Sequence, residues 1–223
     1  MREAIGQVLS LGVGVALSPV PIIAVVLMLA TPRARSNGPA FVLGWVLGLG
    51  LLGTIVLLVS SGADANAADG PATWVSVLEL LLGLLLVAVA VKQWRDRPRG
   101  DAEPKLPTWM RKIDRFTPGR ALGVAVAFAA VNPKNTLLAI GAATAIAGTG
   151  ASTGAQAVAL AVFVVIATLG VGTPVAIYFA LGERSRELLD DLKTWMGRHN
   201  NAIMAVLCLV IGAKLLGDGI ASL

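Results

Sequence analysis

The feature that most constrains the fold of this chain is a series of apolar runs of about 20 residues or more, separated by polar connections. As a helix, which rises 1.5 Å per residue, such a run crosses the roughly 30 Å hydrocarbon core of a bilayer. Charged residues make up only 14% of the 223 residues, too few to cover the surface of a soluble domain. The sequence therefore predicts an all-α polytopic membrane protein. We expect six transmembrane helices, over residues 4–30, 39–60, 73–94, 119–147, 155–181 and 200–221.

Basic residues are distributed unevenly over the connections between these spans. Fifteen of the 18 Lys and Arg residues fall in or beside the first, third and fifth connections, and the second and fourth carry none. Because short cytoplasmic loops are enriched in Lys and Arg, the basic connections are predicted to be cytoplasmic and both termini extracytoplasmic. The expected location is the cell (inner) membrane. The same bias accounts for the net charge of +5, so no nucleic-acid partner is expected.

The first and fourth predicted spans are interrupted near their middle by prolines with polar neighbours. A proline inside a helix removes a backbone donor and clashes with the preceding turn, so the helix must kink or unwind. Backbone groups freed at such a break are tolerated only where protein or water covers them. We therefore expect the two breaks to face the protein interior and to form a substrate-binding or transport site. Its predicted residues are Ser18, Pro19, Pro21, Asn132, Pro133, Lys134 and Asn135.

The equivalent positions of the two breaks divide the chain into halves of three spans. An odd number of spans inverts the second half relative to the first, so residues 1–95 and 119–223 are predicted to be inverted three-helix repeats. Residues 96–118 form the cytoplasmic connection, with an amphipathic helix expected over 107–116. A second amphipathic helix is expected over 186–196, and both would lie on the inner membrane surface. Inverted repeats with discontinuous helices are typical of secondary transporters.

Lys134 is the residue that points most directly to transport. A charged side chain near the bilayer centre costs roughly 3 kcal/mol or more and must face protein or water. The half-helices that begin after the breaks present N–H groups, those following Pro21 and Pro133, and a partial positive charge. Together with the Lys134 ammonium they would favour an anionic group, in a cavity that we expect to be water-accessible. The alternative is that Lys134 only caps backbone carbonyls freed at the kink.

The remaining polar residues indicate no catalytic or metal centre. Glu79 and Lys214 fall at similar predicted depth toward the outer surface, where an ion pair between them is expected to be structural. The chain has one Cys and one His, no cluster with metal-ligand spacing and no phosphate-binding glycine-rich motif. We therefore expect no metal, no cofactor and no enzymatic activity.

Several segments resemble a known group of proteins. "SPVP" followed by "LATPRARSNGPAFVLGWVLG" is similar to the first-repeat signature of the LysE-type exporter superfamily, and "NPKN" is similar to the Asn-Pro-Lys element of its second repeat. The combination of "PRARSNGPAFVLGW", "TPGRALG" and "WMGRHNNAIM" most resembles the Gap family, the glycolipid- or sulfolipid-addressing proteins. The resemblance implies a six-helix secondary exporter of surface glycolipids or related metabolites, with the two proline elements at its centre.

Three functions fit these patterns. The first is export of an anionic or amphipathic, lipid-related metabolite through a midplane site. The second is export of a small solute such as an amino acid, although Val20 stands where amino-acid exporters usually have glycine. The third is a non-transporting scaffold that assists a separate lipid export machine, with lipid-synthesis or lipid-export proteins as partners. Passing a large lipid through six helices would require a homodimer or a lateral opening, and the small-xxx-small pattern "GWVLG" is of the kind that packs helices closely.

Overall fold

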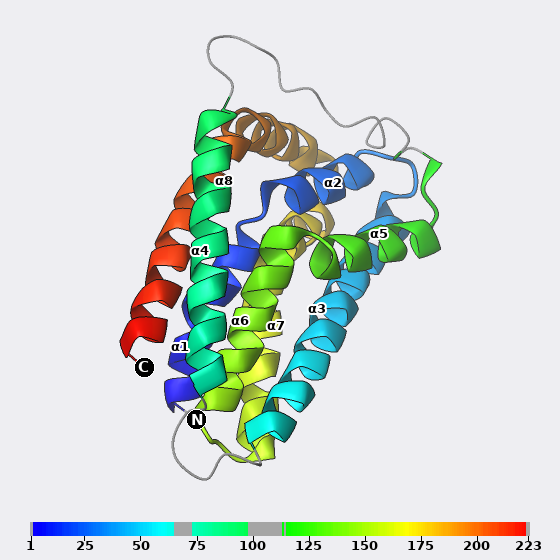
Figure 1. The fold of residues 1–223 in the computed structure, drawn as a ribbon. Coiled ribbons are helices and arrows are strands. Elements are labelled where there is room, and N and C mark those ends of the chain that lie inside the picture. Colours follow the sequence, from blue (N-terminus) through cyan, green and yellow to red (C-terminus); the bar gives the residue numbers. More distant parts are fainter. Residues whose placement is uncertain (1, 65–72, 98–112, 114, 222–223) are drawn as a thin grey trace.

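The structure, a computed structural model, describes residues 2–64, 73–97, 113 and 115–221. All regular secondary structure in this part of the chain is helical (Figure 1), which confirms the predicted all-α class. In chain order the elements are α1 (Arg2–Ala16), α2 (Pro19–Leu29), α3 (Ala34–Asp64), α4 (Thr73–Arg95), α5 (Pro118–Ala130), α6 (Pro133–Gly148), α7 (Thr153–Leu181), the short 3-10 helix η2 (Gly182–Arg184) and α8 (Ser185–Ala221).

Both predicted helix breaks are present. The axes of α1 and α2 differ by 47°, and those of α5 and α6 by 64°. α2 begins at Pro19 and α6 at Pro133, with Ser18 and Asn132 as their N-cap residues. Proline suits the first position of a helix, because the N–H that it lacks would have no partner within that helix. Each proline therefore ends one half-helix and starts the next.

Long apolar helices make the chain a multi-pass membrane protein. Among the described residues, three helical stretches are long and apolar enough to cross a bilayer: Ala34–Ser60, Ser76–Arg95 and Thr153–Ala221. The two bent pairs raise the number of candidate spans to five if each pair is one span. The last stretch contains α7 and α8, which are separated at Gly182, a residue with a φ of 56°. Six spans remain a prediction, because the number depends on how these bent and joined helices are divided.

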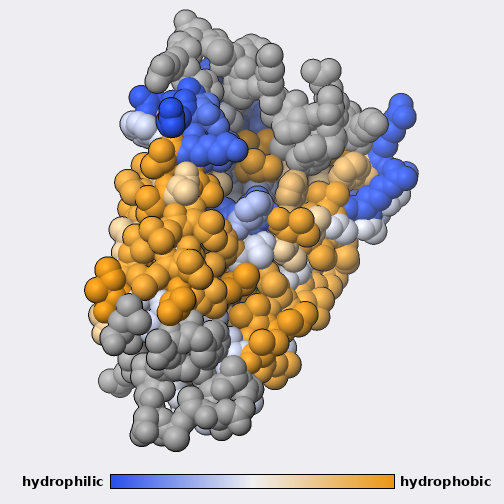
Figure 2. Space-filling model, viewed as in Figure 1, coloured by the Kyte–Doolittle hydropathy of each residue, from blue (hydrophilic) through white to orange (hydrophobic). Residues whose placement is uncertain are grey.

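The two ends of the helix bundle carry different residues. α1 begins and α8 ends at the same end, whereas the α2–α3 turn, the α7–α8 turn and the start of α5 lie at the opposite end (Figure 1). Arg33, Arg120 and Arg184 belong to those three segments. Figure 2 shows hydrophilic residues at this end and a broad hydrophobic surface over the middle of the bundle. The basic connections that the structure describes therefore share one end, which we call the basic end.

Glycines allow three pairs of helices to approach closely. A Cβ atom at Gly44 of α3 would collide with the backbone of α5, and one at Gly170 of α7 would collide with the backbone of α1. Gly83 of α4 and Gly212 of α8 face each other, since a Cβ on either would lie 3.0 Å from the carbonyl oxygen of the other. Such close backbone approach supports helix association in membranes. Gly44 and Gly48, the small residues of "GWVLG", thus pack against α5 of the same chain.

The two predicted amphipathic helices have different outcomes. Residues 107–112 and 114 lie outside the described part of the chain, so the helix expected over 107–116 remains a prediction. Residues 186–196 are helical, but they form the beginning of the 37-residue α8, which corrects the expectation of a separate short helix. This stretch contains neither Pro nor Gly and is rich in good helix formers, so nothing in it ends the helix. Figure 1 shows α8 crossing the basic end and then turning to run beside α4.

Candidate functional site

The two helix breaks meet inside the protein at what we call the junction, formed by Ser18, Lys134 and Asn135 with the backbone of α1. The Ser18 Oγ lies 2.8 Å from Oδ1 of Asn135, and the Lys134 Nζ donates a hydrogen bond of 2.6 Å to the carbonyl oxygen of Gly14. All three side chains are buried, with exposed fractions of 3% or less. The structure therefore brings together residues that are separated by more than 110 positions in the sequence, as predicted for a site between the two breaks.

At the first break, side chains of the junction take over two carbonyl groups that α1 leaves without helical partners. Pro19 has no N–H, so the carbonyl of Val15 lacks the donor that an unbroken helix would provide. The Ser18 Oγ lies 2.7 Å from this oxygen. The carbonyl of Gly14, one position earlier, would bond the N–H of Ser18 in a continuous helix and instead accepts from Lys134. The chain thus compensates this break partly from within and partly from α6.

At the second break, three side chains compensate the backbone. Oδ1 of Asn132 accepts from the backbone N–H of Lys134 at 3.1 Å, which is an N-cap bond. That cap removes the helical donor of the Ala130 carbonyl, and the hydroxyl of Thr136 replaces it at 2.8 Å. The side-chain amide of Asn135 donates to the carbonyl of Phe128 at 3.0 Å. Backbone polar groups in a membrane interior must be satisfied by protein where water is absent, and these bonds do so for the carbonyls of Phe128 and Ala130 and for the N–H of Lys134.

The structure adds Gly14 and Thr136 to the predicted site residues. The carbonyl of Gly14 could have been inferred, because a break at Ser18 leaves the carbonyl four residues earlier without its helical donor. Thr136 lies in the first turn of α6, where a hydroxyl can reach carbonyls of the preceding segment. Their contacts depend on how the two half-helices are oriented, which the sequence does not specify.

Lys134 is more enclosed than predicted. Its exposed fraction is 2%, so in this conformation it does not face a water-accessible cavity. Among the described residues, its ammonium has no carboxylate partner, and the bond to Gly14 is its one hydrogen bond. A buried ammonium has three donors, and a single carbonyl does not neutralise its charge. The junction is therefore closed around a lysine that has no carboxylate counter-ion among the described residues.

The backbone N–H groups expected to receive an anion are also occupied in this conformation. The N–H of Ile22, which follows Pro21, donates to the carbonyl of Ser18 at 3.3 Å. The N–H of Lys134, which follows Pro133, donates to Asn132. An anion could bind these groups only after the cap of α6 or the first turn of α2 rearranges. The expected anion site is thus present in its components but closed.

A second group of charged residues lies where α4 packs against α8. Nζ of Lys214 is 2.5 Å from Oδ2 of Asp218, one turn further along α8. Glu79 of α4 is 7% exposed and interacts electrostatically with both of these residues. Asp218, which sequence reasoning missed, follows Lys214 at the i,i+4 spacing that favours ion pairs in helices. A direct ion pair between Glu79 and Lys214 remains a prediction.

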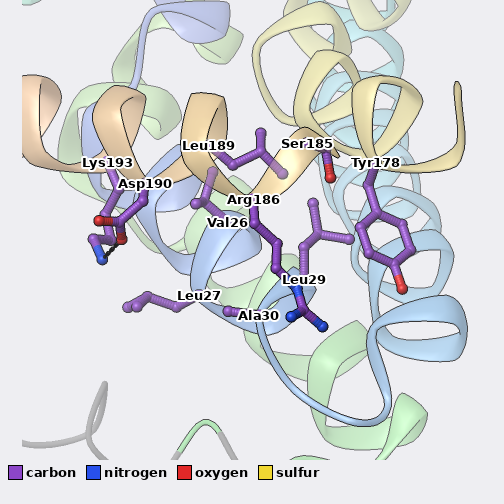
Figure 3. Close-up of a pocket in the computed structure, with 10 residues that line it drawn as sticks. All are labelled: Val26, Leu27, Leu29, Ala30, Tyr178, Ser185, Arg186, Leu189, Asp190 and Lys193. Atoms are coloured by element: carbon purple, nitrogen blue, oxygen red, sulfur yellow. Dashed lines mark hydrogen bonds and ion pairs between the residues drawn. The ribbon is translucent and has the colours of Figure 1, made fainter. Parts of the chain in front are cut away.

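A pocket of about 360 Å³ lies at the basic end of the bundle, away from the junction (Figure 3). Sequence reasoning did not find it, because its walls bring α2 together with α7 and α8, which lie far from α2 in the sequence. The residues that line it are Val26, Leu27 and Leu29 of α2 with its C-cap residue Ala30, Tyr178 of α7, and Ser185, Arg186, Leu189, Asp190 and Lys193 of α8. None of these is a residue of the junction, but α2 runs from the junction to the pocket.

Comparison with known proteins identifies a family. A protein-family model described as Sap, sulfolipid-1-addressing protein, matches residues 8–221, which include both breaks and the pocket. No curated protein and no solved structure matches the chain. The match confirms the resemblance to sulfolipid-addressing proteins, whereas membership of the wider LysE-type superfamily stays a prediction.

Proposed function

The chain belongs to the sulfolipid-1-addressing protein family, and we propose that it is a secondary exporter of an anionic or amphipathic, lipid-related metabolite. The proposal includes the six-helix fold of the LysE-type superfamily and the Gap family's link to glycolipids. Under this proposal the protein is not an enzyme and needs no cofactor, because export of this kind requires only a site that is exposed alternately on the two sides of the membrane.

The observation that carries the proposal is that Lys134, buried where two broken helices meet, has no carboxylate counter-ion among the described residues. One hydrogen bond to the Gly14 carbonyl does not require a lysine, since a neutral donor would serve at lower desolvation cost. Lys134 also lies in the first turn of α6, where the helix dipole disfavours a cation. A positive charge retained against both costs is explained if an anionic substrate binds there.

The hydrogen bonds of the junction suggest how a closed site could open. Rotation of α1–α2 against α5–α6 would separate Lys134 from Gly14 and Ser18 from Asn135. The ammonium and the freed donors would then be available to an anionic group, and Ser18 and Asn132 are natural hinge positions because the helices already break there. Release of the anion would allow the same bonds to form again.

The packing of helices supports the proposed inverted repeats, residues 1–95 and 119–223, joined by residues 96–118. If α1–α4 correspond to α5–α8, the α3–α5 contact corresponds to the α7–α1 contact, and both are made through glycines, Gly44 and Gly170. The α4–α8 contact corresponds to itself, and Gly83 and Gly212 face each other there. With the basic end cytoplasmic, both termini lie outside the cytoplasm, and the chain belongs to the inner membrane.

A non-transporting scaffold is the second candidate, because Lys134 satisfies a freed carbonyl in the closed junction. A scaffold would bind lipid-synthesis or lipid-export proteins and would need no opening of the junction. Export of a small solute is a variant of the first proposal, with the same junction and a different substrate. A homodimer or a lateral opening would give a large lipid more room than one chain provides.

Reconstituted protein separates these functions. Proteoliposomes are loaded either with a sulfated glycolipid in the leaflet facing the basic end or with a labelled amino acid in the lumen. The wild type is expected to move the glycolipid, Lys134→Met to lose this activity, and Lys134→Arg to be impaired because guanidinium is larger and planar. Lys92→Met, which removes a charge from an exposed position at the end of α4, is the matched control. Amino-acid movement alone would favour the small-solute exporter, and movement of neither substrate would favour the scaffold.

A further inference from the structure

The pocket at the basic end combines an apolar wall with charged residues. Val26 and Leu29 of α2 are buried and, with Leu27 and Ala30, supply the apolar wall. Figure 3 shows Arg186 extending from α8 toward Leu29 and Ala30, with Tyr178 on one side and the Asp190–Lys193 pair on the other. An amphipathic ligand, with an apolar part and a polar group, matches this division.

The charged groups of the pocket are held only by weak partners. Arg186 pairs with Glu183 at 3.1 Å, but the two side chains are 73% and 82% exposed. Lys193 pairs with Asp190, and the two side chains are 26% and 67% exposed. Ion pairs in which one or both side chains are largely exposed contribute little and are easily exchanged for another anion. An incoming sulfate or phosphate group would accept charge-assisted hydrogen bonds from both cations.

A neutral donor adds to these two cations. Tyr178, the single tyrosine of the chain, lines the pocket, and its hydroxyl makes no hydrogen bond to any described residue. Its ring is held edge-on against Phe179, with centroids 5.5 Å apart, so the position of the hydroxyl is constrained. A hydroxyl that lines the same pocket as a guanidinium can serve as a further donor to an oxyanion bound there.

Size and position narrow the class of ligand. A volume of about 360 Å³ accommodates a head group and the first part of an acyl chain, but not a whole lipid. The pocket lies at the basic end, where hydrophilic residues border the hydrophobic surface (Figure 2). Basic pockets between helices on the cytoplasmic side of membrane proteins are suited to acidic lipid head groups.

We propose that this pocket binds the sulfate or phosphate head group of an anionic amphiphile, with the start of its acyl chain against α2. Arg186, Lys193 and Tyr178 hold the head group. The pocket is separate from the junction, and one half-helix, α2, joins the two. We further infer that this amphiphile is the exported substrate, and that part of the inference rests on the proposed export function.

Native mass spectrometry of the purified protein in a non-ionic detergent tests the binding itself. The probes are dioctanoyl phosphatidylglycerol, dioctanoyl phosphatidylcholine and inorganic sulfate. The wild type is expected to bind the anionic lipid about tenfold more tightly than the zwitterionic one, since charge-assisted bonds are lost with the latter. Equal binding of the two lipids would overturn the proposal. Thermal unfolding with each probe is measured in parallel. If inorganic sulfate stabilised the protein as much as the anionic lipid does, the pocket would be a site for free anions, which would contradict the proposal that it binds an amphiphile.

Variants locate the binding in the pocket. Arg186→Gln with Lys193→Gln should weaken binding of the anionic lipid about tenfold or more, and Tyr178→Phe by a smaller factor. Asp190→Asn should strengthen it, because Lys193 loses its competing partner. Arg184→Gln and Glu187→Gln remove exposed charges from the same segment without lining the pocket, and neither should change binding more than about twofold. Equal effects of lining and control substitutions would overturn the assignment.

The binding result and the export result are independent. If the wild type moved no glycolipid in proteoliposomes while the pocket variants lost lipid binding, the proposed function would fail and the pocket would stand. If Lys134→Met lost export and the pocket variants bound lipid as the wild type does, the pocket inference would fail alone.

Discussion

Lys134 and Lys214 both lie in apolar stretches of helix, and the protein holds them in different ways. Lys214 is paired with Asp218 of its own helix, and both side chains are about one-third exposed, at 32% and 35%. Lys134 is 2% exposed, donates to a backbone carbonyl, and has no carboxylate partner among the described residues. One charge is compensated within a single helical turn, whereas the other is enclosed where two helices are broken.

The surroundings of the two lysines indicate different roles. A charge that serves only stability is best paired locally and left partly hydrated, as Lys214 is, because burial of an unpaired charge is costly. Lys134 carries that cost, although its contact with Gly14 needs no charge. We infer that Lys214 belongs to the structural framework and that the charge of Lys134 serves a ligand.

The largest expected effect is on export. Lys134→Met should lower export per folded molecule by about 100-fold or more, because the charge-assisted contact with the substrate is lost. Lys214→Met should keep export within about threefold, since its charge acts within the framework. Export of a sulfated glycolipid from proteoliposomes, normalised to folded protein, measures both. Equal losses in the two variants would remove the distinction between the lysines.

The second effect is on stability at the junction. Ser18→Ala leaves the buried Val15 carbonyl and Oδ1 of Asn135 without their hydroxyl partner, at a cost of about 1–2 kcal/mol. Thr144→Val is the control, because the Thr144 hydroxyl is equally buried but bonds carbonyls of its own helix, which keep their helical donors. It should cost less than about 1 kcal/mol. Thermal unfolding in detergent compares the two, and equal costs would mean that the junction bonds add nothing beyond ordinary packing.

The smallest effect concerns the α4–α8 charges. Lys214→Met should lower stability by about 1 kcal/mol, because Asp218 and Glu79 are left as neighbouring acids. Adding Asp218→Asn should restore part of this loss.

Lys134→Met should change stability by no more than about 1 kcal/mol, since loss of one hydrogen bond is offset by removal of a buried charge. A larger loss in Lys134→Met than in Lys214→Met would favour the capping role for Lys134.

Addition of Glu79→Gln to these variants tests the predicted pair between α4 and α8. If Glu79 pairs with Lys214, Glu79→Gln alone should destabilise the protein, and it should have a smaller effect once Lys214 is replaced. The same effect in both backgrounds would show that Asp218 is the partner that matters.

The sequence predicted those features of the junction that depend on local chemistry. Proline removes a donor wherever it stands, so the breaks before Pro19 and Pro133 could be predicted. The position of Lys134 away from lipid could be predicted too, although its closure from water could not. The N-cap role of Asn132 follows in the same way from its position before a proline.

Features that depend on helix orientation could not be predicted. The partner of Lys134 is a carbonyl 120 positions away, and it is within reach only because α1 packs against α6. The closed state of the junction depends on the same packing. The pocket could not be predicted either. In the sequence, nothing distinguishes Arg186 and Lys193 from ordinary surface residues, and only the fold shows that they line a pocket with α2 and Tyr178.

The central claim, that the junction must open for export, is tested most directly by locking it. Oγ of Ser18 and Oδ1 of Asn135 are 2.8 Å apart, so Ser18→Cys and Asn135→Cys, in a Cys208→Ser background, place two thiols on side chains that face each other across the junction. With the disulfide formed and verified by mass, export of the sulfated glycolipid from proteoliposomes should stop, and it should return when the bond is reduced. Export at the same rate in the oxidised and reduced protein would contradict the claim and leave the junction as a static structural cap.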